Sequence, residues 1–117
     1  MRYLLLIYDA ESQWAGLNES QKGQMFQEYM TFTESIKKSG HWLAGQQLQP
    51  IASATTVRIR NGRMTTTDGP FAETREQLGG FYMIEASNLD EATAIAARVP
   101  SAKIGSIEVR PIVERAG

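Results

Sequence analysis

A continuous apolar segment, from Tyr3 to Tyr8, most constrains what this 117-residue chain can fold into. The run is too short to cross a membrane, and no polar side chain interrupts it. Such an unbroken run is typical of a β-strand that is covered on both faces. The segment from Phe81 to Ile84 has the same character. We therefore expect both segments to place apolar side chains on both faces of one sheet.

Two helices are predicted from their capping signals and their apolar periodicity. Asn18 and Gln21 form a capping box at the start of the first helix, expected from Glu19 to Ser39. A second capping box, Asn88 to Glu91, precedes a short alanine-rich helix that Pro100 ends. The expected buried stripes are Phe26, Tyr29, Met30, Thr33, Ile36 and Lys37 in the first helix, and Ala92, Ile95, Ala96 and Val99 in the second.

The clearest hairpin in the chain joins Thr55–Arg60 to Arg63–Thr67. Asn61-Gly62 between the two strands suits a type I′ turn. The two-residue loop fixes the register, so that one face presents Val57, Ile59, Met64 and Thr66, and the other presents Arg58, Arg60, Arg63 and Thr65. The arginine face either keeps the strand edge soluble or contacts an acidic protein partner.

Further strands are expected at 41–45, 81–86 and 107–113, with polar connections at 9–17, 46–54 and 72–78. Without the hairpin, the order is β-α-β-β-α-β. This order predicts an α+β fold in which two helices cover one face of an antiparallel sheet. The length predicts a single domain over residues 1–117.

The second face of this sheet is expected to be apolar and uncovered. Large apolar patches are rare on small monomers, so we expect a second copy of the chain to pack sheet against sheet as a homodimer. The enclosed cavity would be lined mostly by apolar groups. Its polar candidates are Tyr82, Glu108, Arg110 and His41.

Composition excludes several function classes. With 12 Lys and Arg against 13 Asp and Glu, the net charge is -1, which argues against direct binding of nucleic acid. The absence of cysteine and the single histidine argue against thiolate, iron–sulfur and multi-histidine metal sites, so no metal or cofactor is expected. No membrane span or cleavable leader is recognisable, and a cytoplasmic location is the default expectation.

The motif Asp68-Gly69-Pro70-Phe71, followed by Gly79-Gly80-Phe81-Tyr82, resembles the DGPF motif of YCII-related proteins. The segments 44–50, 88–92 and 105–111 resemble the same family. The resemblance implies a ferredoxin-like fold of the dimeric α/β-barrel type, with no established activity for the DGPF group. Relatives encoded beside extracytoplasmic-function sigma factors imply a sigma factor as a partner. A histidine–aspartate pair was proposed for shorter members, but Glu28 and Tyr29 occupy the stretch where their helical histidine is expected.

Asp68 and the charged segment after it are the first candidate site. Asp68 is either a turn residue that accepts hydrogen bonds from nearby amides or a pocket carboxylate that acts as a general base. Arg75 is either exposed or holds an anionic group, with Glu73 or Glu76 fixing its guanidinium.

Three further candidates have competing structural roles. Tyr82 is expected in the core or an interface, where its hydroxyl needs a partner. His41 is either a capping or surface residue or a catalytic base, because its ordinary pKa lies near neutrality. Gly79-Gly80 is interpreted as the entry to a strand.

Two functions remain open from the sequence. The first is a small dimeric protein that binds a small polar or anionic molecule at the sheet face, with acid–base chemistry on Asp68. The alternative is a non-enzymatic regulatory module that works with a sigma factor.

Overall fold

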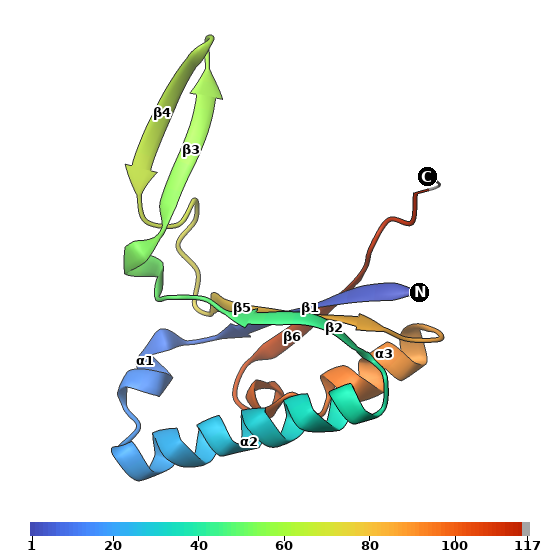
Figure 1. Cartoon of the computed structure of the whole chain (residues 1–117). Helices are drawn as coiled ribbons and strands as arrows, with labels where there is room; N and C mark the ends of the chain where they lie inside the picture. Colours follow the sequence, from blue (N-terminus) through green and yellow to red (C-terminus); the bar gives the residue numbers. More distant parts are fainter. Residues whose placement is uncertain (116–117) are drawn as a thin grey trace.

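A four-stranded antiparallel sheet organises the chain in the order β2-β5-β1-β6. It is seen in a computed structural model that describes residues 1–115. All helices lie on one side of the sheet, and a separate hairpin projects on the other side (Figure 1). The sheet strands are β1 (Arg2–Asp9), β2 (Trp42–Gln47), β5 (Gln77–Glu85) and β6 (Ser106–Pro111), and the hairpin strands are β3 (Thr55–Arg60) and β4 (Arg63–Asp68).

The helical layer contains one long and two shorter helices, α2 (Glu19–Lys38), α1 (Glu11–Ala15) and α3 (Leu89–Ala96), and a 3-10 turn at Pro100–Lys103. A second 3-10 turn, Ile51–Ser53, lies between β2 and β3 on the side of the hairpin (Figure 1). Leaving out the hairpin and α1, the order is β-α-β-β-α-β. The predicted ferredoxin-like α+β fold with an inserted hairpin is therefore confirmed. None of the helices in residues 1–115 combines the length and the apolar character needed to cross a membrane.

Strict alternation along β1 separates the two faces of the sheet. Tyr3, Leu5 and Ile7 are buried under the helices. Leu4, Leu6 and Tyr8 point to the face without helices and are only half-buried. Across the pairs Leu4↔Met83 and Leu6↔Phe81, strand β5 adds two more half-buried apolar side chains to that face. We call these five residues, Leu4, Leu6, Tyr8, Phe81 and Met83, the open face.

The capping box predicted at the start of α2 is present. The Asn18 side chain accepts a hydrogen bond from the Gln21 amide at 2.8 Å, and the Gln21 side chain accepts one from the Asn18 amide at 3.0 Å. At α3 only half of the expected box forms, because Glu91 accepts from the Ser87 amide rather than from Asn88.

The predicted stripe of α2 was only partly correct. Ile36 is buried, and Tyr29 and Thr33 are half-buried, as expected. Phe26, Met30 and Lys37 are exposed instead, and Met25 and Phe32 are buried. Apolar residues stand side by side in this sequence, as Met25-Phe26 and as Tyr29-Met30, so two adjacent helical stripes both have the correct period. The sheet selects between them, which periodicity alone cannot do.

The expected strand at 81–86 begins earlier, at Gln77, and includes Gly79 and Gly80. Gly80 pairs with Ile7 on one side and with Gln47 on the other. A Cβ atom at Gly80 would lie 2.9 Å from the Gln46 carbonyl oxygen. The two glycines therefore belong to the strand and allow its neighbour to approach closely. Other differences are the helix α1 in the connection predicted at 9–17, the extension of β2 to Gln47, and the bounds 106–111 of the last strand.

Two glycines provide a matched test of this packing. A Cβ at Gly105 would lie 2.1 Å from the Tyr8 carbonyl oxygen, whereas a Cβ at Gly23 in α2 would meet nothing within 4 Å. We expect Gly105→Ala to lower the free energy of unfolding by about 3 kcal/mol, because the backbone must shift. We expect Gly23→Ala to raise it by about 1 kcal/mol through helix propensity. Urea denaturation measures both, and equal effects would contradict the packing at Gly105.

Candidate functional site

A depression of about 340 Å³, wide open to solvent, lies at one end of the open face. It forms where β1 ends, β6 begins and the segment before β5 crosses the sheet. Its lining residues are Tyr8, Thr74, Glu76, Ser106, Ile107 and Glu108. Polar groups from three distant parts of the sequence therefore meet beside the apolar open face.

Two carboxylates dominate the chemistry of this depression. Glu76 Oε1 accepts a hydrogen bond from Ser106 Oγ at 2.8 Å. Glu108 Oε2 is 2.8 Å from Arg110 Nε, and the pair is exposed on the Arg110 side. The second oxygens of both carboxylates, Glu76 Oε2 and Glu108 Oε1, accept no hydrogen bond from residues 1–115. They can therefore accept hydrogen bonds from a bound molecule.

Within residues 1–115, no group of three or more His, Cys, Asp and Glu side chains is placed to hold a metal ion.

A buried polar network lies on the opposite face of the same end of the sheet. Asp9, only 6% exposed, accepts hydrogen bonds at Oδ2 from Trp14 Nε1 at 2.9 Å and from Ser101 Oγ at 2.8 Å. Because Ser101 donates its proton to Asp9, the Tyr29 hydroxyl, 2.5 Å from Ser101 Oγ, must donate to Ser101. The network thus ties α1, α2 and the 3-10 turn at Pro100–Lys103 to the end of β1.

The position of Tyr29 in this network changes its acidity. Burial raises the pKa of Tyr29 to about 12, the Ser101 hydrogen bond opposes the rise, and the negative charge of Asp9 adds to it. The neutral phenol is therefore the form that the folded protein stabilises.

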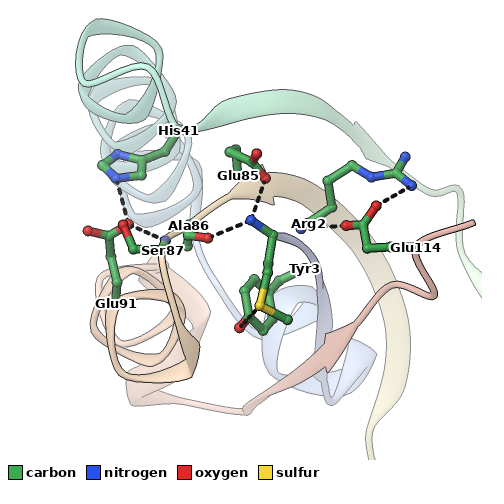
Figure 2. Close-up of polar contacts among 9 residues, drawn as sticks. Arg2, Tyr3, His41, Glu85, Ala86, Ser87, Glu91 and Glu114 are labelled. Atoms are coloured by element: carbon green, nitrogen blue, oxygen red, sulfur yellow. Dashed lines mark hydrogen bonds and ion pairs between the residues drawn. The ribbon is translucent and has the colours of Figure 1, made fainter. Parts of the chain in front are cut away.

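Asp68 and His41 lie at different ends of the molecule. His41 Nδ1 is 2.6 Å from Ser39 Oγ. Its Nε2 is 3.3 Å from Glu91 Oε1, next to the start of α3 (Figure 2). The hydrogen bond from the Ser87 amide lowers the pKa of Glu91, and His41 adds to this effect. Asp68 is exposed at the foot of the hairpin, opposite Thr55. The structure does not bring these two residues together (Figure 1).

Tyr82 faces the helices and not the open face. It is buried, its hydroxyl oxygen is 2.8 Å from Thr33 Oγ1, and its ring packs edge-on against Phe32 with centroids 5.2 Å apart. Burial raises the pKa of Tyr82, and the Thr33 hydrogen bond partly opposes the shift. The expected core role of Tyr82 agrees with this placement. The expectation that Tyr82 lines a cavity on the open face is wrong, because its side chain points to the helices.

Three of the remaining candidates lie in or beside the depression. Glu76 and Glu108 line it, and Arg110 is paired with Glu108. Glu73 and Arg75 are exposed on the segment that also supplies Thr74 and Glu76.

Three polar groups of this region were not predicted from the sequence: Asp9, Tyr8 and Ser106. Asp9 had a usable signal, because it continues the alternation of Tyr3, Leu5 and Ile7 on the buried face. Ser106 had none, since its contact with Glu76 spans 30 residues of sequence.

The Tyr29 network leads to a prediction about alkaline stability. The ordinary tyrosine pKa of 10.0 applies to the unfolded chain and the value of about 12 to the folded one. Unfolding therefore releases a proton between these pH values, and the stability from neutral Tyr29 is complete below pH 10 and is lost as the pH approaches 12. We expect Tyr29→Phe to cost about 1 kcal/mol at neutral pH through the lost hydrogen bond.

That difference should shrink as the pH rises above 10.0, because only the wild type loses stability through Tyr29. Urea denaturation of both proteins over this range measures it. Tyr82 is present in both proteins, so its own contribution cancels. A constant difference at every pH would contradict the proposed effect of burial on Tyr29.

Comparison with known proteins identifies the family of this chain and a solved structure of similar fold. Residues 1–116 match the model of the YCII-related domain. An uncharacterised protein of Rhizobium meliloti (strain 1021) is 34% identical over 114 residues, which cover 96% of this chain and 92% of that protein. A solved structure of 5-chloro-2-hydroxyhydroquinone dehydrochlorinase (TftG) from Burkholderia phenoliruptrix AC1100, in complex with 2,5-dihydroxybenzoquinone, is similar with a TM-score of 0.57. It is 14% identical, and the match covers 98% of this chain and 96% of that one, so the likeness concerns the fold. The family resemblance expected from the DGPF motif is confirmed, and the chain belongs to the family of YCII-related domain proteins.

Proposed function

We propose that this protein is a homodimer that binds a small polar molecule in the depression, with Glu76 and Glu108 as hydrogen-bond acceptors. The observation that supports this proposal is the adjacency of an uncovered apolar face and two carboxylates with free oxygens. A second copy over the open face would remove the apolar side chains from water and turn the depression into an enclosed site.

The lining favours a neutral ligand that donates hydrogen bonds. An anionic group would be repelled by Glu76 and Glu108, whereas hydroxyl or amino groups would find acceptors. Tyr8 adds an aromatic surface against which a flat ring can pack. The dehydrochlorinase of similar fold was solved with 2,5-dihydroxybenzoquinone, a small oxygenated ring, which supports a ring of this size as the ligand.

The same carboxylates are the groups in the depression that can accept a proton from a bound hydroxyl. Acid–base chemistry at this site would therefore use Glu76 or Glu108. Asp68, at the foot of the hairpin, is not among the residues that line the depression.

Ligand binding is tested in calorimetric titrations with hydroquinone, a neutral hydrogen-bond donor, and with 2,5-dihydroxybenzoquinone, an anion at neutral pH, as the comparison. We expect wild type to bind hydroquinone more tightly than the anion, and Glu76→Gln or Glu108→Gln to weaken hydroquinone binding about tenfold, because each removes an ionised acceptor. Glu73→Gln is the matched control, since Glu73 is exposed on the same segment and does not line the depression. If the two site variants bind as tightly as the control, the assignment of Glu76 and Glu108 is wrong.

Dimer formation through the open face has its own test. We expect light scattering at micromolar concentration to show a dimer for the wild type and a monomer for Leu6→Glu, because a charge at the centre of the open face must be desolvated. Leu89→Glu is the control, since Leu89 is exposed on α3, on the helical side. Circular dichroism verifies that both variants are folded. A monomeric wild type would reject this part of the proposal.

A further inference from the structure

The hairpin β3–β4 stands apart from the rest of the molecule, and we call residues 55–68 the arm. Its two strands pair with each other in a two-stranded sheet of their own. The arm projects from one end of the main sheet, on the side of the open face and away from the helices (Figure 1).

The arm presents a stripe of apolar side chains to solvent. Val57 is 58% exposed, Ile59 62% and Met64 67%. Ile59 and Met64 pair across the strands, and Val57 pairs with Thr66, so the three apolar side chains share one face. An isolated two-stranded hairpin is marginally stable in water, and this one exposes its apolar side chains as well.

We infer that the arm packs its apolar stripe against a second copy of this chain. The inference extends the proposed homodimer and depends on it. Packing against another copy would supply the packing partner that a lone hairpin lacks, and would bury Val57, Ile59 and Met64.

The length of the arm and the usual spacing of two packed sheets support a second copy of the chain as the partner of the arm. Each arm strand has six residues, or about 20 Å at the usual rise per residue. Two sheets that pack face to face lie about 10 Å apart. The arm is therefore longer than the distance between the two sheets. If a second copy packs on the open face, the arm extends beside the sheet of that copy. Two-fold symmetry brings the partner's arm past this chain in the same way.

Charge supports the same occupant. The arm contains Arg58, Arg60 and Arg63 and one carboxylate, Asp68. The rest of the chain contains nine of the 12 Lys and Arg residues and twelve of the 13 Asp and Glu residues, so it is net acidic. The three arginines lie on the face opposite the apolar stripe. Their charge therefore attracts the arm to the acidic body of another copy over a distance, and the contact itself is made by the apolar stripe.

The arm is also connected to the depression. Gly69 begins the segment that leads from the arm to β5, and Thr74 and Glu76 of the depression belong to that segment. Packing of the arm on the second copy therefore restrains the segment that supplies these two lining residues.

The absence of cysteine from the chain permits a direct test. Ile59→Cys places one thiol on the apolar face of the arm, and Thr65→Cys places one on the opposite face, where Thr65 pairs with Arg58. Both variants are reacted with a maleimide at protein concentrations from well below to well above the dissociation constant of the dimer, measured by light scattering for each variant.

We expect the thiol of Ile59→Cys to react at least about tenfold more slowly above that concentration than below it, because the rate follows the fraction of free arms. The thiol of Thr65→Cys should show a much smaller change. Equal rates for Ile59→Cys at all concentrations, in a protein that does dimerise, would overturn the arm inference and leave the open-face dimer standing. A wild type that is monomeric at every concentration would overturn both.

Discussion

The alternation of side chains along β1 is the constraint on which the rest of the structure depends. This strand lies inside the sheet, between β5 and β6, so both of its faces are decided by packing. Its odd-numbered residues form the core with α2 and α3, and its even-numbered residues form the open face. A shift of one residue in register would exchange the two sets, so burial of Leu5 and Ile7 fixes the placement of Leu6 and Tyr8.

The end of β1 joins these two faces to the candidate site. Tyr8 points into the depression, while Asp9, the next residue, points into the buried network with Ser101 and Trp14. Burial of a carboxylate is costly unless donors compensate it, and here two donors converge on Asp9 Oδ2. The helices are thereby held against the same end of the sheet at which the depression forms.

Local signals in the sequence predicted the elements that depend on neighbouring residues. The turn at Asn61-Gly62 has φ values of 54° and 75°, as a type I′ turn requires, and the pairing of Ile59 with Met64 follows from it. The capping box at Asn18 is equally local. The buried face of α2 was not predictable in this way, because Met25 and Phe26 compete for the core and only the sheet decides between them.

The candidate site was only partly predictable for the same reason. Glu76 and Glu108 were named from the sequence, but their common location depends on β6 lying beside β1, which brings Ser106 to Glu76. Tyr82 illustrates the opposite case. A strand with apolar residues on both faces gives no indication of which face carries the helices, and the bulge between Ile7 and Tyr8 changes the register of β5 next to Gly79.

The DGPF motif gains a physical role from this arrangement. Gly69 has a φ of 100°, a conformation that side chains disfavour, and it lies where the arm returns to the sheet. Its amide donates to the Ala54 carbonyl at 2.7 Å, and its own carbonyl accepts from Thr56 Oγ1 at 2.8 Å. These bonds close the foot of the arm. The motif therefore sets the direction of the arm relative to the segment that supplies Glu76, which links the most recognisable sequence of the family to the surface and the depression that the fold leaves open.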